Sequence, residues 1–205
     1  TKDFSYSIEN KSLDARNKNN IYWEMRLLVS SDAISESLPD IQPELYIPYK
    51  KREKSVVVVG SGPAGFFAAF TLQKAGFSTT IIERGTDVKK RTEGIESFES
   101  TGIFDPISNY AFGEGGAGTF SDGKLTSRSK RISLEKKFIL SSYIKAGAPE
   151  EIEYMTHPHV GSDNLKLIVE NLRKQFIDIG GTVLFETTMT EMVVKNNIVS
   201  KIKTS

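Results

Sequence analysis

The sequence predicts an α/β fold built on a parallel sheet, and three observations carry this prediction. Residues 56–59 are four consecutive valines, which is typical of a parallel strand buried on both faces. A turn with glycines at positions 60, 62 and 65 follows, and then an Ala-, Phe- and Leu-rich run that ends at Gly76. Residues 78–82 indicate a second strand, directly before Glu83. This strand–turn–helix–strand order predicts a βαβ unit.

The glycine turn has the spacing of a dinucleotide-binding motif, and its context is that of a Rossmann-like domain. Gly60 permits the tight turn, Gly62 leaves the backbone open to a pyrophosphate, and Gly65 lets the helix pack closely on the strand. The N-terminus of that helix offers free N–H groups and a positive dipole end to phosphates. Glu83 follows about 20 residues later, where its carboxylate can accept hydrogen bonds from two ribose hydroxyls.

The composition excludes several classes of protein. The 205 residues include 27 basic and 26 acidic side chains, a balance that argues against a general nucleic-acid or membrane-surface binder. There is no cysteine, so disulfides, thiolate metal sites and a redox-active CxxC pair are excluded within these residues. No apolar run approaches the ~18 residues that a membrane span needs, and residues 1–10 lack the layout of a signal peptide. We therefore expect a cytoplasmic protein.

The region before the valine run forms a separate segment in this prediction. Residues 3–9 and 21–29 indicate strands, residues 31–37 a short helix or loop, and residues 39–48, with three prolines, a connection. We expect residues 1–50 to be part of a small β-rich or α+β domain with its linker, and residues 51–205 to be an incomplete Rossmann-like domain. The basic stretch 11–20 could touch an RNA or a partner, although a solvated loop is the favoured interpretation.

The remaining elements alternate between helices and strands. We expect a helix over residues 88–99 capped by Thr86 or Asp87, a helix over 132–146, and an amphipathic helix that begins at Ser162 or Asp163. The apolar face of the last helix comprises Leu165, Ile168, Val169, Leu172, Phe176 and Ile179. Strands are predicted at residues 182–185, 188–195 and 198–204, the last two as a hairpin around Asn196 and Asn197.

A second glycine-rich stretch, residues 112–125, has five glycines in fourteen residues. Glycines let a backbone approach a ligand and present N–H groups as an anion nest, while Phe112, Phe120 and Leu125 would anchor the loop to a core. The alternative is a flexible surface loop. Arg84 and Arg91 lie near the expected phosphate and ribose site, where a guanidinium fork suits phosphate oxygens. His157 and His159 flank a proline, an arrangement that suits proton transfer better than metal chelation, and no metal site is expected.

Several of these stretches together resemble a known family. They are GSGPAGFFAAFTLQKAGFSTTIIERG with DVKKR, NYAFGEGGAGTFSDGKL, HPHVGSDNL and GGTVLFETTMTEM. They are similar to the bacterial uncharacterised FAD-dependent dehydrogenases, flavoproteins with a glutathione-reductase-like FAD fold. The resemblance covers residues 2–205. It implies FAD as cofactor and assigns cofactor contacts to Gly60, Ser61, Gly62, Pro63, Ala64, Gly65, Glu83, Arg84, Arg91, Gly115, Gly116, Ala117, Gly118, Thr119, Ser121, Asp122, Gly123, Lys124 and Met189.

Within that resemblance, residues 60–65 match the pyrophosphate turn, Met189 the position beside the adenine, and Gly115 to Lys124 the loop against the ribityl chain and flavin ring. Met189 is bulkier than the family's usual valine. The later Gly-Asp motif and the substrate-bearing portion are absent, and the chain starts at Thr1 and stops within the expected hairpin. We therefore expect a piece of a longer protein that by itself binds FAD weakly and is inactive.

The function that follows is a flavin-dependent oxidoreductase, with NAD(P)H as a possible electron donor. Two alternatives stay open: a non-catalytic flavin-binding module that docks RNA or a partner, and a dehydrogenase that uses NAD(P) alone. His157, His159 and Lys124 are the candidates for proton transfer, but the sequence does not identify a catalytic residue. The sequence specifies neither the substrate, nor the electron acceptor, nor the oligomeric state.

Overall fold

The computed structural model describes residues 3–32, 43–127, 129–130 and 132–205. Contacts between residues divide the chain into two compact units. The first unit combines Thr1–Leu45 with Lys124–Val160, and the second combines Tyr46–Gly123 with Gly161–Ser205. The predicted division of the chain after residue 50 stays a prediction.

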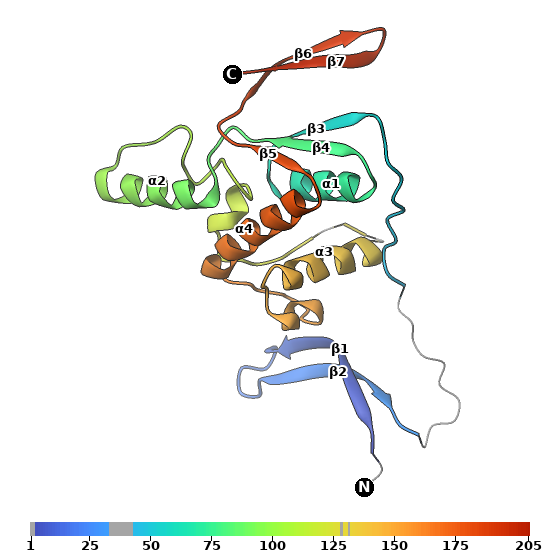
Figure 1. Cartoon of the computed structure of the whole chain (residues 1–205). Helices are drawn as coiled ribbons and strands as arrows, with labels where there is room; N and C mark the ends of the chain where they lie inside the picture. Colours follow the sequence, from blue (N-terminus) through green and yellow to red (C-terminus); the bar gives the residue numbers. More distant parts are fainter. Residues whose placement is uncertain (1–2, 33–42, 128, 131) are drawn as a thin grey trace. The chain divides into compact units, whose positions relative to one another are not determined.

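The second unit contains the predicted parallel sheet (Figure 1). Strands β3 (Ser55–Val59), β4 (Ser78–Ile82) and β5 (Thr182–Leu184) pair in parallel in the order β3-β4-β5. Helix α1 (Pro63–Lys74) joins β3 to β4, and α2 (Val88–Thr101) follows β4. The α/β, Rossmann-like fold class is thereby confirmed. Asp87 is the N-cap of α2, because its carboxylate accepts hydrogen bonds from the N–H groups of Lys89 and Lys90 at 2.9 and 3.1 Å.

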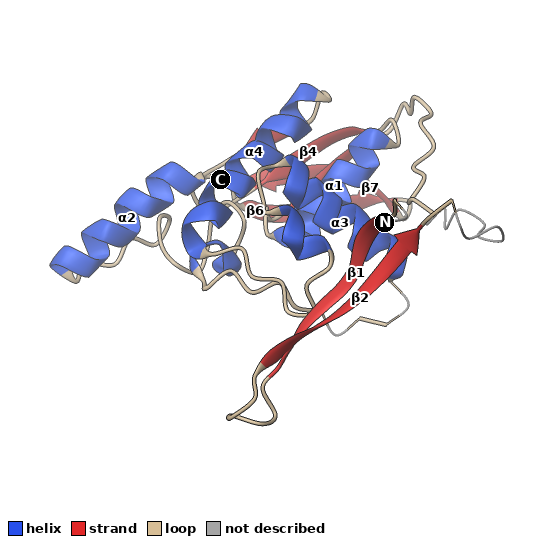
Figure 2. Cartoon of the chain, turned by 90° about the horizontal axis from the view of Figure 1, so that it is seen from below, coloured by secondary structure: helices blue, strands red, loops and turns tan. Residues whose placement is uncertain are grey.

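Helices α1 and α4 (Ser162–Asp178) lie on the same face of this sheet (Figures 1 and 2). The ring of Phe66 on α1 lies 6.2 Å from the ring of Phe176 on α4, and Phe176 is completely buried. The predicted apolar face of α4 is confirmed for four residues that are at most 7% exposed: Leu165, Ile168, Leu172 and Phe176. It is wrong for Ile179, which is 42% exposed because the helix has already ended.

Strand β3 is not buried on both faces, contrary to the prediction from its valines. Val57 and Val59 are 41% and 55% exposed, whereas Val56 and Val58 are less accessible. The parallel register pairs Val59 with Ile82, and Ile82 with Leu184, which is 46% exposed. The physical reason is that α1 and α4 cover the opposite face, and β3 is an edge strand of the described sheet.

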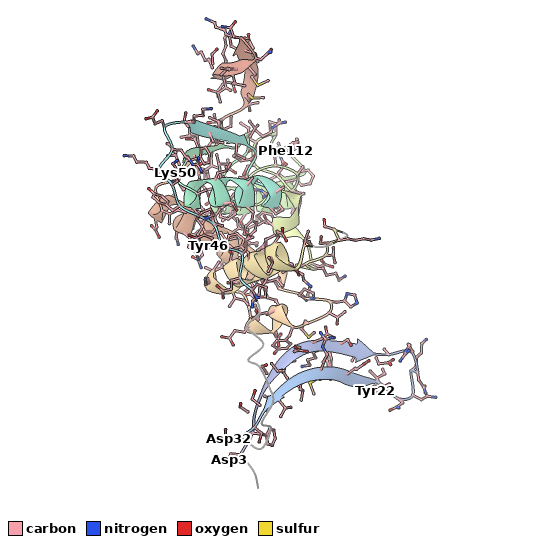
Figure 3. The ribbon with its side chains drawn as sticks, turned by 90° about the vertical axis from the view of Figure 1, so that its right-hand side faces the viewer. Asp3, Tyr22, Asp32, Tyr46, Lys50 and Phe112 are labelled. Carbon is pink, nitrogen blue, oxygen red and sulfur yellow. The ribbon has the colours of Figure 1, made fainter. Side chains whose placement is uncertain are left out.

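Glycines permit the close contacts of the βαβ unit. A Cβ atom on Gly65 would lie 2.1 Å from the carbonyl oxygen of Gly60, so α1 can pack this closely on the turn only without a side chain. Gly76 ends the α1 region with φ +96°, and a Cβ there would lie 2.2 Å from the carbonyl oxygen of Lys50. Figure 3 labels Lys50 on the segment that leads into β3. The N–H of Lys50 donates to the carbonyl of Ala75.

In the first unit, β1 (Ser5–Asp14) and β2 (Tyr22–Ser30) form an antiparallel hairpin. The predicted strand at 3–9 therefore continues to Asp14, and a bulge between Ile8 and Asn10 adjusts the register. Helix α3 (Ser133–Lys145) and the 3-10 helix η2 (Glu150–Glu153) belong to the same unit. Lys11 exchanges main-chain hydrogen bonds with Tyr154 and Thr156, which ties β1 to this segment. Most of the expected helix or loop at 31–37 lies outside the described residues.

The C-terminal elements match their prediction closely. Strands β6 (Met189–Lys195) and β7 (Ile198–Thr204) form the expected hairpin, and its turn residues Asn196 and Asn197 have φ +50° and +59°. The short 3-10 helix η1 (Ala117–Phe120) lies within the second glycine-rich stretch. Across the described part of the chain, no helix combines the length and the apolar character needed to cross a membrane.

Candidate functional site

A cavity of about 270 Å³ lies in the second unit, where strands β3 and β4 end. In α/β proteins, ligands bind outside the carboxyl ends of parallel strands. Four separate segments supply its walls: the end of β3, the end of β4, the glycine-rich loop, and the start of β6. The lining residues are Val59, Gly60, Ile82, Glu83, Arg84, Ala111, Phe112, Gly113, Gly116, Thr187, Thr188 and Met189.

The glycine turn between β3 and α1 is open to a ligand. Gly62 is the N-cap of α1 and Pro63 is its first residue; the first turn of this helix carries no acidic side chain. Pro63 and Ala64 are exposed. A Cβ atom on Gly62 would meet only the Cα of Gly116, at 4.0 Å, so the glycine leaves real space above the turn. The N–H groups at this helix end and its dipole therefore face a region that an anion can enter.

The carboxylate of Glu83 is the best-bonded group at the site. Its Oε2 accepts hydrogen bonds from the N–H and the hydroxyl of Ser61 at 2.8 and 2.9 Å. Its Oε1 accepts from the N–H groups of Gly85 and Gly113 at 2.9 and 3.2 Å. Burial by itself raises the pKa of Glu83, but these hydrogen bonds outweigh it and leave the pKa below its ordinary value. Glu83 is therefore an ionised acceptor that joins the turn to the glycine-rich loop.

Arg91 lies inside the protein rather than at the surface of the cavity. Its side chain is completely buried, and its guanidinium donates to the carbonyl oxygens of Asn109, Tyr110, Glu114 and Gly116 at 2.6 to 3.1 Å. Burial lowers its pKa to about 10. These hydrogen bonds hold the backbone of the glycine-rich loop from the interior of the unit. The direct contact predicted between Arg91 and a cofactor stays a prediction.

Glu114, which is buried, and Arg173, which is half-buried, form an ion pair beside the loop. Glu114 Oε1 lies 2.7 Å from Arg173 Nε, a charge contact whose geometry is not that of an aligned hydrogen bond. Glu114 Oε2 accepts a hydrogen bond from the N–H of Val88 at 2.8 Å. Burial raises the pKa of Glu114 despite these partners. The pair connects the loop to α2 and α4.

Arg84 and Phe112 form an exposed wall of the cavity. The guanidinium carbon of Arg84 lies 4.1 Å from the centre of the Phe112 ring, within the range of a cation–π contact. Phe112 is 37% exposed, and its side chain is labelled in Figure 3. The predicted placement of Arg84 near the nucleotide stays a prediction, and its position on the cavity wall is compatible with it.

The predicted loop from Gly115 to Lys124 is only partly at the cavity. Gly116 lines it, and the N–H of Gly115 donates to the carbonyl of Ser61 at 3.2 Å. Thr119 faces inward, because it is 1% exposed and its hydroxyl donates to the carbonyl of Glu114. The hydroxyl of Ser121 donates to the carbonyl of Gly118. Contacts of residues 117–123 with a flavin remain predictions.

Lys124, His157 and His159 belong to the first unit. Lys124 and His159 form an isolated antiparallel bridge, and the N–H of Leu125 donates to the carbonyl of Pro158 at 3.0 Å. Both histidines are exposed, whereas Pro158 between them is buried. Their role in proton transfer stays a prediction.

Sequence reasoning missed several residues of the site. Ala111, Gly113, Thr187 and Thr188 line the cavity, and Glu114 and Arg173 support it. The sequence holds one signal for Glu114, which is a charged residue flanked on both sides by glycines, in a stretch that is not expected to be helical. Arg173 lies on a helix among other polar residues, and nothing in its pattern distinguishes it.

A family model described as an FAD-binding domain matches residues 53–188. The match covers more than half of the chain, so the chain belongs to this family of FAD-binding domains, which is related to flavoprotein oxidoreductases. The matched residues include the glycine turn, Glu83 and the loop that lines the cavity.

Two curated relatives are proteins much longer than this chain. An uncharacterized protein of Clostridium beijerinckii is 40% identical over 202 residues, which is 92% of this chain and 37% of that protein. The small chain of NADPH glutamate synthase from Bacillus subtilis is 29% identical over 136 residues, 66% of this chain and 20% of that protein. The chain thus spans well under half the length of both.

Two solved structures resemble parts of the chain. The THI4 protein of Thermovibrio ammonificans aligns with a TM-score of 0.45 and 16% identity, over 75% of this chain and 47% of that one. Glycine oxidase from Bacillus cereus aligns with a TM-score of 0.37 and 15% identity, over 75% of this chain and 52% of that one.

Proposed function

We propose that this protein is an FAD-dependent oxidoreductase and that the cavity holds the adenosine diphosphate half of FAD. One observation carries the proposal: four segments from different parts of the sequence border a single cavity at the ends of parallel strands. The segments are the turn after β3, the residues after β4 that include Glu83, the glycine-rich loop, and the start of β6. Membership of the FAD-binding family supports the same ligand.

The residues present fit this part of FAD. The uncapped N-terminus of α1 and the open space above Gly62 suit a pyrophosphate. Glu83, held ionised, suits the ribose hydroxyls, because a carboxylate is an acceptor-only group. Val59, Ile82 and Met189 offer apolar surface to the adenine, and the Arg84–Phe112 wall offers a flat, cationic one.

Bound FAD would supply the two-electron chemistry, and the protein would bind it, orient it and shield it from water. NAD(P)H is the proposed electron donor; the name of the Bacillus glutamate synthase relative includes NADPH, which supports this choice. Lys124, His157 and His159 remain the proposed groups for proton transfer.

The test has three parts. Calorimetric titration of the chain with ADP should show saturable binding; absence of binding would refute the assignment of the cavity. The cofactor released from the full-length protein should be FAD, and NAD in its place would favour a dehydrogenase that uses NAD(P) alone. Reduction of the bound flavin by NADPH, followed at its visible absorption band, should support turnover of a dye acceptor; a flavin that no nicotinamide reduces would indicate a non-catalytic flavin module.

A further inference from the structure

The Glu83 carboxylate already has its full set of hydrogen bonds within the protein. A carboxylate offers roughly four acceptor positions, and Glu83 receives four donors: the N–H and hydroxyl of Ser61 and the N–H groups of Gly85 and Gly113. A ribose hydroxyl can therefore bind this carboxylate well only if one of the four donors leaves.

Three of the four donors are main-chain groups held in place by packing. A Cβ atom on Gly85 would lie 2.5 Å from both the N and the Cα of Gly113, so these two backbones are in tight contact. The Arg91 guanidinium further fixes the loop on both sides of Gly113. The N–H of Ser61 belongs to the turn whose neighbour Gly60 is bonded to Ile82. None of these groups can turn away without moving a backbone segment.

The hydroxyl of Ser61 differs, because rotation about a single side-chain bond removes it from Glu83. Glu83 is among the residues that line the cavity, and Ser61 is not; both side chains are 6% exposed. A ligand that enters the cavity thus meets the carboxylate whose Oε2 accepts the Ser61 hydroxyl.

We propose that the Ser61 hydroxyl occupies, in the free protein, the position on Glu83 that a ribose hydroxyl takes in the nucleotide complex. Ser61 thereby limits how strongly the site distinguishes nucleotides with ribose hydroxyls from nucleotides without them. This inference rests on the proposed function, since it concerns the same cavity and the same nucleotide.

The test compares ADP with 2′,3′-dideoxy-ADP by calorimetric titration of the unaltered chain and of Ser61→Ala. In the unaltered chain, loss of the ribose hydroxyls lets the Ser61 hydroxyl stay on Glu83, so the ratio of the two dissociation constants should be below about tenfold. In Ser61→Ala, dideoxy-ADP leaves one acceptor position of Glu83 unpaired, and the ratio should rise by roughly tenfold. Ser61→Thr keeps a hydroxyl and should restore the original ratio.

Ser142→Ala is the matched control, because Ser142 is also 6% exposed and its hydroxyl is bonded to a main-chain carbonyl, of Phe138, in the other unit. It should leave the ratio unchanged. An unchanged or smaller ratio in Ser61→Ala would overturn the inference while ADP binding still supports the proposed function. A ratio of a hundredfold or more in the unaltered chain would also overturn it, without any variant. Failure of ADP to bind at all would overturn both.

Discussion

At the scale of single residues, the site depends on two charged side chains that are bonded to backbone rather than to opposite charges. Glu83 collects N–H groups from the turn and the loop, and Arg91 donates to four carbonyl groups of the same loop. Burying a charge without such partners costs free energy, so the backbone groups that bond each of these side chains must stay in position around it. The two together give the loop one conformation.

Glu83 should make the free energy of unfolding depend on pH in the acidic range. Its pKa is lower in the folded protein than its ordinary value of 4.5, so its stabilising contribution is complete above about pH 4.5 and is lost as the pH falls through the lowered pKa. Glu83→Gln should reduce the free energy of unfolding at pH 7 by about 2 kcal/mol, because the glutamine amide is uncharged and has one acceptor oxygen, so two of the four donors around it face an NH2 group instead of an acceptor. Urea unfolding should give a smaller difference in the free energy of unfolding between the two proteins at pH 3 than at pH 7. An equal difference at both pH values would contradict the role assigned to Glu83.

Arg91→Lys should destabilise the protein although the charge is kept. A lysine ammonium lacks the planar fork and cannot reach four carbonyl groups at once, so we expect a loss of about 3 kcal/mol in the free energy of unfolding. ADP binding should weaken with it, since the loop lines the cavity. Arg52→Lys is the control, at an exposed arginine that contacts the Phe77 ring. Equal stability of the two variants would show that the carbonyl contacts contribute little.

At the scale of elements, the turn between β3 and α1 uses its glycines for two different purposes. Gly65 permits the contact of α1 with the turn, whereas Gly62 leaves space that the protein itself does not fill. The same substitution at these two positions should therefore have opposite consequences for folding and for binding.

Gly62→Ala should fold normally and lose ADP, because its Cβ finds room in the free protein, its φ of −63° suits alanine, and the methyl group occupies the proposed phosphate position. Its free energy of unfolding should stay within about 0.5 kcal/mol of the original. Gly65→Ala should lose about 3 kcal/mol or more, since its Cβ would overlap the Gly60 carbonyl.

Thermal unfolding and ADP titration of both glycine variants provide the measurement. Gly102→Asn is the control, at the left-handed residue that ends α2, where asparagine is tolerated and a Cβ meets open space. Normal ADP affinity in Gly62→Ala would place the phosphates elsewhere.

At the scale of the whole molecule, all residues that line the cavity belong to one of the two compact units. A chain that begins at Tyr46 lacks β1 and β2 but keeps every lining residue. It should bind ADP with a dissociation constant within about twofold of the original, because sites without shared partners act independently. Titration of the shortened chain, with its helix content checked by circular dichroism, tests this. A large loss of affinity in a folded shortened chain would show that the first unit contributes to the nucleotide site.

The sequence predicted the βαβ unit, its helix and strand order, the C-terminal hairpin and the FAD-binding family, because these depend on local patterns. Glycine spacing, apolar periodicity and the position of Glu83 are each set within about 30 residues of chain. The exposure of Val57 and Val59 was not predictable in this way, since four valines look the same in an edge strand and in a central one.

What the sequence alone determined is therefore the FAD-binding family and the order of the elements that carry the glycine turn and Glu83. Only the tertiary structure decided how those segments are held: Arg91 is turned inward onto the loop, Glu114 is paired with Arg173, and Glu83 is saturated by neighbours that include Ser61. The physical reason is that these contacts depend on how the glycine-rich loop packs on the turn, on α2 and on α4, and the spacing of residues along the chain does not specify that packing.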